Sequence, residues 1–363
     1  MPYFCSQFLI MARFHLLKVK DVKRETPEAV SVAFEVPPQQ QPEYLFKMGQ
    51  YITLKFKVNG EEIRRSYSIC TAPHEMELRV AVKEVQGGKG SEFINRNLKL
   101  GDTVEVMTPM GTFNTPLKGA NKKHYVLFAG GSGITPMMSI IKSVLYVEKQ
   151  SSITLFYANK NEDTSIFKAE LESLAATHPN LKLVLVYDAP KASLPELNCG
   201  MVTQQKAETL VKAMSCEKAD EYFICGPGPL MENVKLALEG LKVAKEKIHI
   251  EYFTSVLEAV DKASAPSGAD VKAHIKVIQY GIETEFPLET SGLSILEAAI
   301  EAGVDAPFSC KGAVCCTCRA KVLEGKVKMN ANFALTEQEV EEGYVLTCQS
   351  HPLTEIVTID YDA

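Results

Sequence analysis

The sequence lacks any apolar run of the roughly 20 residues that a membrane-spanning helix requires. Residues 1–15, MPYFCSQFLIMARFH, also lack the basic start and the small-residue cleavage site of a secretory signal peptide. We therefore expect a cytoplasmic protein without membrane contact. Met11 is an equally good start, in which case residues 1–10 lie outside the native protein.

An excess of positive charge is absent as well. The 39 Lys and Arg residues face 45 Asp and Glu residues, and the net charge of −6 argues against nucleic acid as the main partner. Residues 271–363 contain 7 basic and 14 acidic residues, so nearly all of the net negative charge belongs to the C-terminal segment. The 10 cysteines of this 363-residue chain do not form a small secreted disulfide framework, which fits a reducing cytosol.

Four of these cysteines form a pattern near the C-terminus. Cys310, Cys315 and Cys318 have C-x4-C-x2-C spacing, and Cys348 follows on a later segment. This spacing is typical of a plant-type [2Fe–2S] site. A structural zinc site usually combines two short Cys/His pairs, and zinc or free thiols are the alternatives here. Cys316 lies between two of the expected ligands, and we interpret it as a small side chain that faces away.

Short segments of alternating apolar and polar residues fill the region from Arg13 to Pro116, and proline and glycine separate them. The strand-like segments lie at 30–36, 50–58, 66–70, 77–85 and 102–109. Period-2 alternation at this spacing predicts a small antiparallel β-barrel.

Two stretches of the predicted barrel suggest a ligand site. Arg65, Tyr67 and Ser68 offer a guanidinium, an aromatic ring and a hydroxyl on one strand-like segment. Residues 87–98 form a Gly-rich turn and a short helix, with Ser91 as the expected N-cap and free backbone N–H groups that attract an anion. Taken alone, the first stretch is more typical of an ordinary strand with a surface arginine, and the second of an ordinary capped turn.

From about Lys122 the pattern changes to strands that alternate with helices. The expected strands lie at 124–130, 153–159, 181–188, 221–226 and 248–253, and the expected helices at 136–147, 166–176, 203–214 and 229–241. This alternation predicts a parallel sheet with helices on both faces and with ligands at the C-terminal ends of its strands.

Glycine-rich segments end two of these predicted strands. GGSGITP spans 130–136, where glycines allow a pyrophosphate to approach the backbone and Pro136 lies in the first helical turn. This segment is not the G-x-G-x-x-G fingerprint, so the general dinucleotide-binding rule does not cover it. Cys225 and Gly226 end the fourth strand, and Cys225 taken alone is typical of a small buried apolar residue.

If the predicted parallel sheet binds a nicotinamide dinucleotide, the segment after its second strand bears on the choice between NAD and NADP. Binders of NAD often carry an acidic residue here for the ribose hydroxyls, and binders of NADP a basic one. Lys160 follows the strand, and no acidic residue precedes Glu162. The charge therefore favours NADPH, with NADH as the alternative.

The C-terminal segment begins after a small polar stretch with proline and glycine at 260–270, which predicts a semi-flexible linker. Beyond the linker the sequence predicts a hairpin, a helix and two further strands, at 273–281 with 282–289, at 294–302, and at 319–325 and 344–350. The acidic stretch 335–344 is typical of a solvated helix face and is also a candidate docking surface.

The motifs RRSYSIC, GGSGITP, CGPGPLM, PFSCKGAVCCTCRAKVLEGKVKM and GYVLTCQS, in this order, resemble those of the ferredoxin–NADP reductase superfamily. From Arg13 to Ala363 the chain is similar to the reductase components of bacterial multicomponent oxygenases, in particular to the reductase subunits that serve the di-iron phenylacetyl-CoA epoxidase of phenylacetate degradation. The resemblance implies an antiparallel FAD-binding β-barrel, a parallel-sheet NAD(P)-binding α/β domain, a linker and a β-grasp ferredoxin domain, at 11–118, 119–257, 258–271 and 272–363.

The resemblance also implies roles for individual residues. Arg65 is expected at the flavin pyrophosphate, Tyr67 on the isoalloxazine ring and Ser68 near its reactive nitrogen. The other expected cofactor-binding residues are Gly88 and Ser91 at the flavin phosphates, Gly131, Gly133, Thr135, Pro136, Lys160, Cys225 and Gly226 at the nicotinamide nucleotide, and Phe253 against the flavin, where core packing is the alternative. The expected metal ligands are Cys310, Cys315, Cys318 and Cys348.

The expected function is electron transfer from NAD(P)H through FAD and the [2Fe–2S] cluster to a partner oxygenase. The chain supplies position and redox tuning for this function, and no catalytic acid, base or nucleophile. The alternatives are a reductase that serves another multicomponent oxygenase or a desaturase, and a redox sensor that reduces no acceptor.

Overall fold

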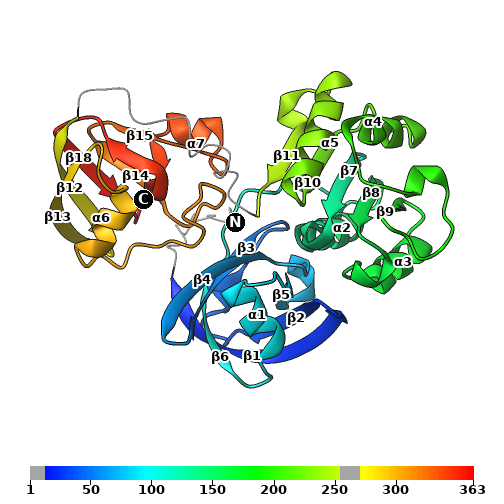
Figure 1. The fold of residues 1–363 in the computed structure, drawn as a ribbon, viewed down its shortest axis with the longest axis horizontal. Helices are drawn as coiled ribbons and strands as arrows, with labels where there is room; N and C mark the ends of the chain where they lie inside the picture. The colour runs from blue at the N-terminus through cyan, green and yellow to red at the C-terminus, as the bar shows by residue number, and fades with distance from the viewer. Residues whose placement is uncertain (1–12, 254–269) are drawn as a thin grey trace, which may run out of the picture. The chain divides into compact units, whose positions relative to one another are not determined.

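The computed structural model describes residues 13–253 and 270–363. The chain divides into two compact units, of which one spans Leu16–Phe253 and the other contains residues 270–363. In Figure 1 the first unit runs from blue to green and the second from yellow to red. The expected start at Met11 and most of the predicted linker lie outside the described residues. No helix in the described ranges has the length and apolar character needed to cross a membrane.

The first part of the Leu16–Phe253 unit is an antiparallel half-barrel of six strands in the order β4-β3-β6-β1-β2-β5 (Figure 1). The strands are β1 (Phe14–Thr26), β2 (Ala29–Glu35), β3 (Tyr51–Val58), β4 (Glu61–Ser68), β5 (Leu78–Lys83) and β6 (Thr103–Met107). Alternate residues of a strand face the same side, so Val30, Val32 and Phe34 of β2 all enter one apolar core. The predicted antiparallel barrel is confirmed.

Two features of this sheet were not predicted. β1 is missing from the predicted strands because register shifts after Val19 and after Arg24 interrupt its alternation. β4 begins at Glu61, five residues before the predicted strand. It forms a tight hairpin with β3 through Asn59 and Gly60, whose φ angles of 51° and 83° suit a two-residue turn.

The second part of this unit is a parallel sheet in the order β11-β10-β7-β8-β9. Its strands are β7 (His124–Gly130), β8 (Ser152–Asn159), β9 (Leu181–Tyr187), β10 (Glu221–Cys225) and β11 (Ile248–Glu251), and its helices are α2 (Ile134–Val147), α3 (Lys168–Thr177), α4 (Gln204–Ala213) and α5 (Gly228–Gly240). Leu127 of β7 packs in a core with α2 and α3, whereas its neighbour Phe128 packs in another core with α4 and α5. Helices therefore cover both faces, as predicted.

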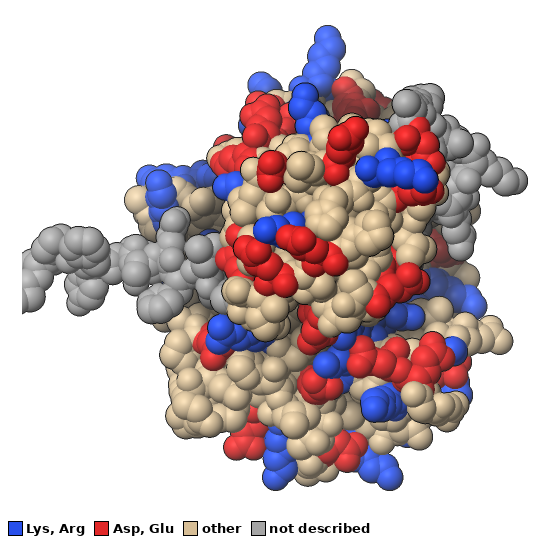
Figure 2. Space-filling view, turned by 90° about the vertical axis from the view of Figure 1, so that its left-hand side faces the viewer, with Lys and Arg blue, Asp and Glu red and all other residues tan. Residues whose placement is uncertain are grey.

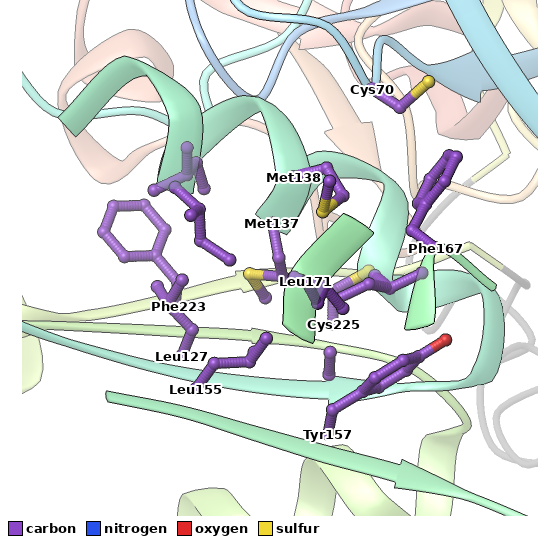
Figure 3. Close-up of a cluster of buried hydrophobic side chains, with 14 of the residues drawn as sticks. Cys70, Leu127, Met137, Met138, Leu155, Tyr157, Phe167, Leu171, Phe223 and Cys225 are labelled. Carbon is purple, nitrogen blue, oxygen red and sulfur yellow. The ribbon is translucent and has the colours of Figure 1, made fainter. Parts of the chain in front are cut away.

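One apolar cluster joins the two parts of the first unit. Figure 3 shows Met137 and Met138 of α2 above Leu127 and Leu155 of the sheet, with Cys225 in the same cluster. Barrel residues belong to it as well, namely Ala29, Met48, Cys70, Ala81 and Phe113. Because apolar surface from both parts is removed from water together, the barrel and the α/β sheet pack as one body.

The second unit has a five-stranded sheet in the order β13-β12-β18-β14-β16 and a separate β15-β17 pair. Its elements are β12 (Lys272–Gln279), β13 (Ile282–Glu289), α6 (Ile295–Glu301), β14 (Arg319–Glu324), β15 (Val327–Met329), α7 (Glu337–Glu341), β16 (Tyr344–Leu346), β17 (Ser350–Pro352) and β18 (Ile356–Asp360). The hairpin and the helix at 294–302 were predicted. β18 was not, although it pairs with both β12 and β14 at the centre of the sheet.

Charged pairs lie along the β12–β13 hairpin. Lys272 pairs with Glu289 at 3.3 Å, and Lys276 pairs with Glu283 at 2.9 Å. Figure 2 views the molecule from this side, and blue and red side chains lie next to one another in several places. The acidic stretch at 335–344 contains α7, which has no buried residue and was correctly predicted as a solvated helix face.

Candidate functional site

The structure brings the four predicted cysteine ligands together as two pairs. Cys315 Sγ lies 3.1 Å from Cys310 Sγ. A hydrogen bond likewise joins the thiols of Cys318 and Cys348. Cys310 is partly exposed and the other three are buried. In the described part of the chain, no three His, Cys, Asp or Glu side chains surround a single metal position. Two pairs of thiols are the donor set that two irons need, because each takes two thiolates.

The surroundings of each pair favour the thiolate form of one sulfur, whereas the pKa of the donating partner, Cys315 or Cys318, is raised by that same hydrogen bond and by burial. The hydrogen bond from Cys315, helped by the Gly312 N–H at 3.3 Å, lowers the pKa of Cys310 to about 6. The hydrogen bond from Cys318 likewise lowers the pKa of Cys348. Each pair therefore holds one sulfur that ionises readily, which is the form that binds metal.

The backbone of the cysteine loop is tightly curled. Lys311 and Ala313 have positive φ angles of 50° and 62°, which non-glycine residues rarely adopt. Cys316 turns out of the loop, because its Sγ donates to the carbonyl of Ala334 at 3.3 Å and its side chain lies in the apolar core. The interpretation that Cys316 faces away from the other cysteines is confirmed.

In the barrel, the structure brings the two predicted ligand stretches side by side. A Cβ placed on Gly90 would lie 3.2 Å from Cγ of Arg65. Arg65 of β4 is thus adjacent to the start of α1 (Lys89–Arg96). A cation and free helical N–H groups at one place favour a bound phosphate.

The prediction that Ser91 caps this helix is wrong. α1 begins at Lys89 and its N-cap is Gly88. The Ser91 hydroxyl instead accepts from the Val85 N–H at 3.0 Å and donates to the Gly88 carbonyl at 3.1 Å. These bonds close the Gly-rich turn. The Ser91 hydroxyl therefore has its partners within the turn that precedes the helix, and it does not cap the helix.

Two glycine segments of the α/β part meet at the C-terminal edge of the sheet. A Cβ on Gly133 would lie 2.1 Å from the Cys225 carbonyl oxygen, and a Cβ on Gly226 would lie 2.9 Å from the Gly130 nitrogen. Gly226 also has a φ of 159°. Backbone therefore packs on backbone where β7 and β10 end, and only glycine fits. Thr135 and Pro136 follow in the first turn of α2, where Thr135 Oγ1 donates to the Ser132 carbonyl at 3.0 Å.

A carboxyl group that sequence reasoning missed lies between the barrel and the sheet. Ser68 Oγ donates to Glu251 Oε2 at 3.1 Å, and Glu251 is the register partner of Cys225 on neighbouring strands. Burial raises the pKa of Glu251 to about 8. Burial, followed by the charge of Glu251, raises the pKa of the Cys225 thiol. A lone acidic residue in the apolar strand IHIEYF was the signal that could have identified it.

Because Glu251 holds its proton more tightly in the folded protein, its contribution to stability is full below about pH 4.5 and is lost as the pH rises towards 8. We expect flavin-free wild-type protein to lose about 2 to 4 kcal/mol relative to Glu251→Gln across this range. Urea unfolding at pH 5, 6, 7 and 8 measures the difference. If the free energies of unfolding of the two proteins changed in parallel with pH, the raised pKa of Glu251 would be contradicted.

The remaining predicted residues lie at the ends of β8 and β11. Lys160 is exposed one residue after β8 and has no ion pair in the described structure. The nearby Glu162 is engaged, because its carboxylate accepts from the Lys191 N–H at 3.0 Å. Phe253 is 39% exposed at the end of the first unit. Its side chain is therefore not part of the apolar core.

Comparisons with known proteins cover all three parts of the chain. The model of an oxidoreductase FAD-binding domain matches residues 16–115, that of an oxidoreductase NAD-binding domain 127–236, and that of a 2Fe-2S iron-sulfur cluster binding domain 277–353. The chain is 37% identical over 354 residues to one of the subunits of the 1,2-phenylacetyl-CoA epoxidase of Escherichia coli K12, and the match covers 97% of this chain and 99% of that protein.

Two further known proteins match this chain along almost their entire length. The ferredoxin reductase component of the 3-ketosteroid-9-alpha-monooxygenase of Mycobacterium tuberculosis is 33% identical over 95% of both chains. The structure of phthalate dioxygenase reductase has a TM-score of 0.58 at 23% identity and covers 96% of this chain and 98% of its own, which shows a shared fold. The chain therefore belongs to the ferredoxin–NADP reductase superfamily and, within it, to the oxygenase reductases that combine FAD-binding, NAD-binding and [2Fe–2S] domains.

Proposed function

We propose that this oxygenase reductase supplies electrons to a di-iron oxygenase of the phenylacetyl-CoA epoxidase type. The observation that carries the proposal is the 37% identity to the epoxidase protein of Escherichia coli along 97% of the chain. The acceptor is a separate protein, so the substrate of the oxygenase need not contact this chain. The 33% identity to the ketosteroid monooxygenase component favours a second candidate, an oxygenase that hydroxylates a ring system.

The two candidates differ in the acceptor that the reductase recognises. Purified protein is added with NADPH to the oxygenase subunits of a phenylacetyl-CoA epoxidase, and separately to a ketosteroid monooxygenase. We expect product formation only with the epoxidase. Equal product formation in both systems, or formation only from the steroid, would overturn the proposed acceptor.

The cysteine pairs fit a [2Fe–2S] cluster. Cys310 with Cys315 would hold one iron, and Cys318 with Cys348 the other. This assignment rests on the 3.1 Å contact in the first pair and on the hydrogen bond in the second. The curled backbone around Lys311 leaves N–H groups such as that of Gly312 directed at sulfur. Such bonds stabilise the negative charge of a reduced cluster.

The barrel residues fit FAD. Arg65 and the N–H groups that follow Gly88 would hold the pyrophosphate, because the guanidinium-bearing residue lies beside the start of α1. Tyr67 is partly buried on the same strand and would lie against the flavin ring, and Phe253 at the end of the unit is exposed enough to cover the other side. Ser68 would place its hydroxyl oxygen near the reactive end of the ring, because the hydrogen bond that it donates to Glu251 orients it.

The glycine segments fit a nicotinamide nucleotide. Gly131 and Gly133 would leave room for its pyrophosphate, and Thr135 and Pro136 begin the helix beneath it. Cys225 and Gly226 would line the nicotinamide, since they end the strand next to Glu251. When bound, FAD takes an electron pair from NAD(P)H and the cluster takes electrons one at a time. The chain contributes the alignment of the two rings and the exclusion of water from the space between them.

Lys160 is proposed to bind the 2′-phosphate of NADPH. Its ammonium has no ion pair in the described structure, and the nearby Glu162 is engaged by backbone N–H groups. Loss of one charged hydrogen bond costs about 1.5–3 kcal/mol, so Lys160→Ala is expected to lower kcat/KM for NADPH roughly 10- to 100-fold. The value for NADH should change little.

The matched control for this experiment is Lys212→Ala, which removes another exposed lysine, one paired with Glu208 on α4. Steady-state kinetics with both nucleotides measure the effect in each variant. Equal losses for NADPH and NADH in Lys160→Ala would contradict the assignment of Lys160 to the phosphate.

A further inference from the structure

A buried glutamine lies directly beside the fourth cysteine. Gln349 is 7% exposed and belongs to η8 (Thr347–Gln349), the short helical turn that carries Cys348. Its side-chain Nε2 donates to Cys348 Sγ at 3.7 Å and to the backbone carbonyl of Lys311 at 3.2 Å. An amide nitrogen carries two hydrogens, so both of its donors are directed at the cysteine site.

These two bonds connect segments that are far apart in the sequence. Lys311 lies in the loop that carries Cys310, Cys315 and Cys318, and it has a φ of 50°. The Gln349 backbone is fixed as well, because its carbonyl accepts from the Asn330 N–H at 2.9 Å. One side chain of fixed position therefore holds the curled loop against the segment that supplies the fourth thiol.

We propose that Gln349 is a positioning residue that raises the reduction potential of the cluster through its N–H···S hydrogen bond to Cys348. The proposal rests on the ligand assignment made above. Reduction adds one negative charge to the cluster and its sulfurs. A donor fixed against a ligand sulfur stabilises the reduced state more than the oxidised state. The same residue, through Lys311, keeps that sulfur at a constant place relative to the other three.

If Gln349 had a purely structural role, its substitution would lower stability and leave the cluster potential unchanged. A neighbouring hydrogen-bond network offers a control for that case. The Tyr361 hydroxyl donates to Thr347 Oγ1 at 2.8 Å, and Thr347 Oγ1 donates to the Cys318 carbonyl at 3.0 Å. This network also holds a cysteine segment in place, but it ends on a backbone carbonyl and not on sulfur. Tyr361→Phe is therefore a matched control that weakens the support without removing a donor from a ligand.

The test compares Gln349→Leu and Gln349→Glu with wild-type protein and Tyr361→Phe, all as the full chain with flavin and cluster. Both substitutions keep much of the volume and remove the N–H donors. Iron and sulfide content per chain measures assembly, and a redox titration followed by electron paramagnetic resonance measures the midpoint potential of the cluster. The flavin potential in the same samples is the internal reference.

We expect both Gln349 variants to retain the cluster at a more negative potential, with the larger shift in Gln349→Glu because of its added charge. Tyr361→Phe should lose thermal stability at an unchanged potential, and the flavin potential should not move in any variant. An unchanged cluster potential in both Gln349 variants overturns the proposal, as does loss of the cluster in both. A wrong ligand assignment would be recognised by a separate result. In that case the Cys348→Ser variant would keep its iron.

Discussion

Replacing Cys348 by serine is expected to abolish the cluster and to leave reduction of the flavin by NADPH intact. Cys348 is a buried thiol paired with Cys318, so under the proposed ligand assignment its loss would leave one iron with a single thiolate. The residues proposed to bind flavin and nicotinamide belong to the other compact unit, Leu16–Phe253. Substitution of a residue that hydrogen-bonds to a metal ligand typically lowers metal affinity or activity about 10- to 100-fold. Loss of a ligand itself should therefore lower electron delivery to a one-electron acceptor by at least about 100-fold.

Iron content, visible absorbance and NADPH-driven reduction of cytochrome c measure these effects. The matched control is Cys316→Ser, which changes the cysteine whose Sγ donates to the Ala334 carbonyl. This variant should keep its iron and most of its activity. Loss of flavin reduction in Cys348→Ser, or loss of the cluster in Cys316→Ser, would contradict the description of the site.

Replacing Gly133 by alanine is expected to block reduction by NADPH while leaving the cluster in place. The added Cβ would lie 2.1 Å from the Cys225 carbonyl oxygen and 2.4 Å from its carbon, so backbone must move. Overpacking typically costs about 1–3 kcal/mol, and occasionally more. The movement shifts the end of β10, where the nicotinamide is proposed to lie. A displacement of about 1 Å between reacting groups can cost about 100-fold in rate.

The control for this substitution is Gly228→Ala at the first position of α5. A Cβ on Gly228 has no neighbour within 4 Å, and its φ is not positive. The Gly228→Ala variant should react with NADPH at the wild-type rate. Stopped-flow absorbance of the flavin measures the rate, and chemical reduction by dithionite should still bleach flavin and cluster in both variants. An unchanged rate in Gly133→Ala would show that the glycine contact does not position the nucleotide.

Much of this arrangement could be predicted because it is encoded locally. Alternation defined the barrel strands, the strand–helix rhythm defined the parallel sheet, and the spacing of the cysteines indicated the cluster. The strands β1 and β18 were missed because register shifts interrupt the alternation of β1 and because β18 is short. The cap of α1 was misassigned because Ser91 bonds to Val85 and Gly88, a local geometry that composition does not specify.

Glu251 was missed for a different reason. Its role depends on Ser68, which is 183 residues away in the chain and in another sheet. The same holds for Gln349, whose amide contacts Lys311 across a separation of 38 residues. Neither contact leaves a pattern in the spacing of neighbouring residues, because each follows from how distant segments pack. Residues whose contacts join distant segments are therefore harder to identify from sequence than residues that belong to a local motif.

In the proposed function, one chain takes electrons from NADPH and passes them through flavin to the cluster. An anaerobic absorbance titration of the purified protein with NADPH tests it most directly, with NADH as the parallel sample. The account predicts that flavin and cluster bands both bleach, at about three electrons per chain, and that NADPH is the better donor. Bleaching of the flavin bands alone, in a protein that contains its full iron and sulfide, would contradict it.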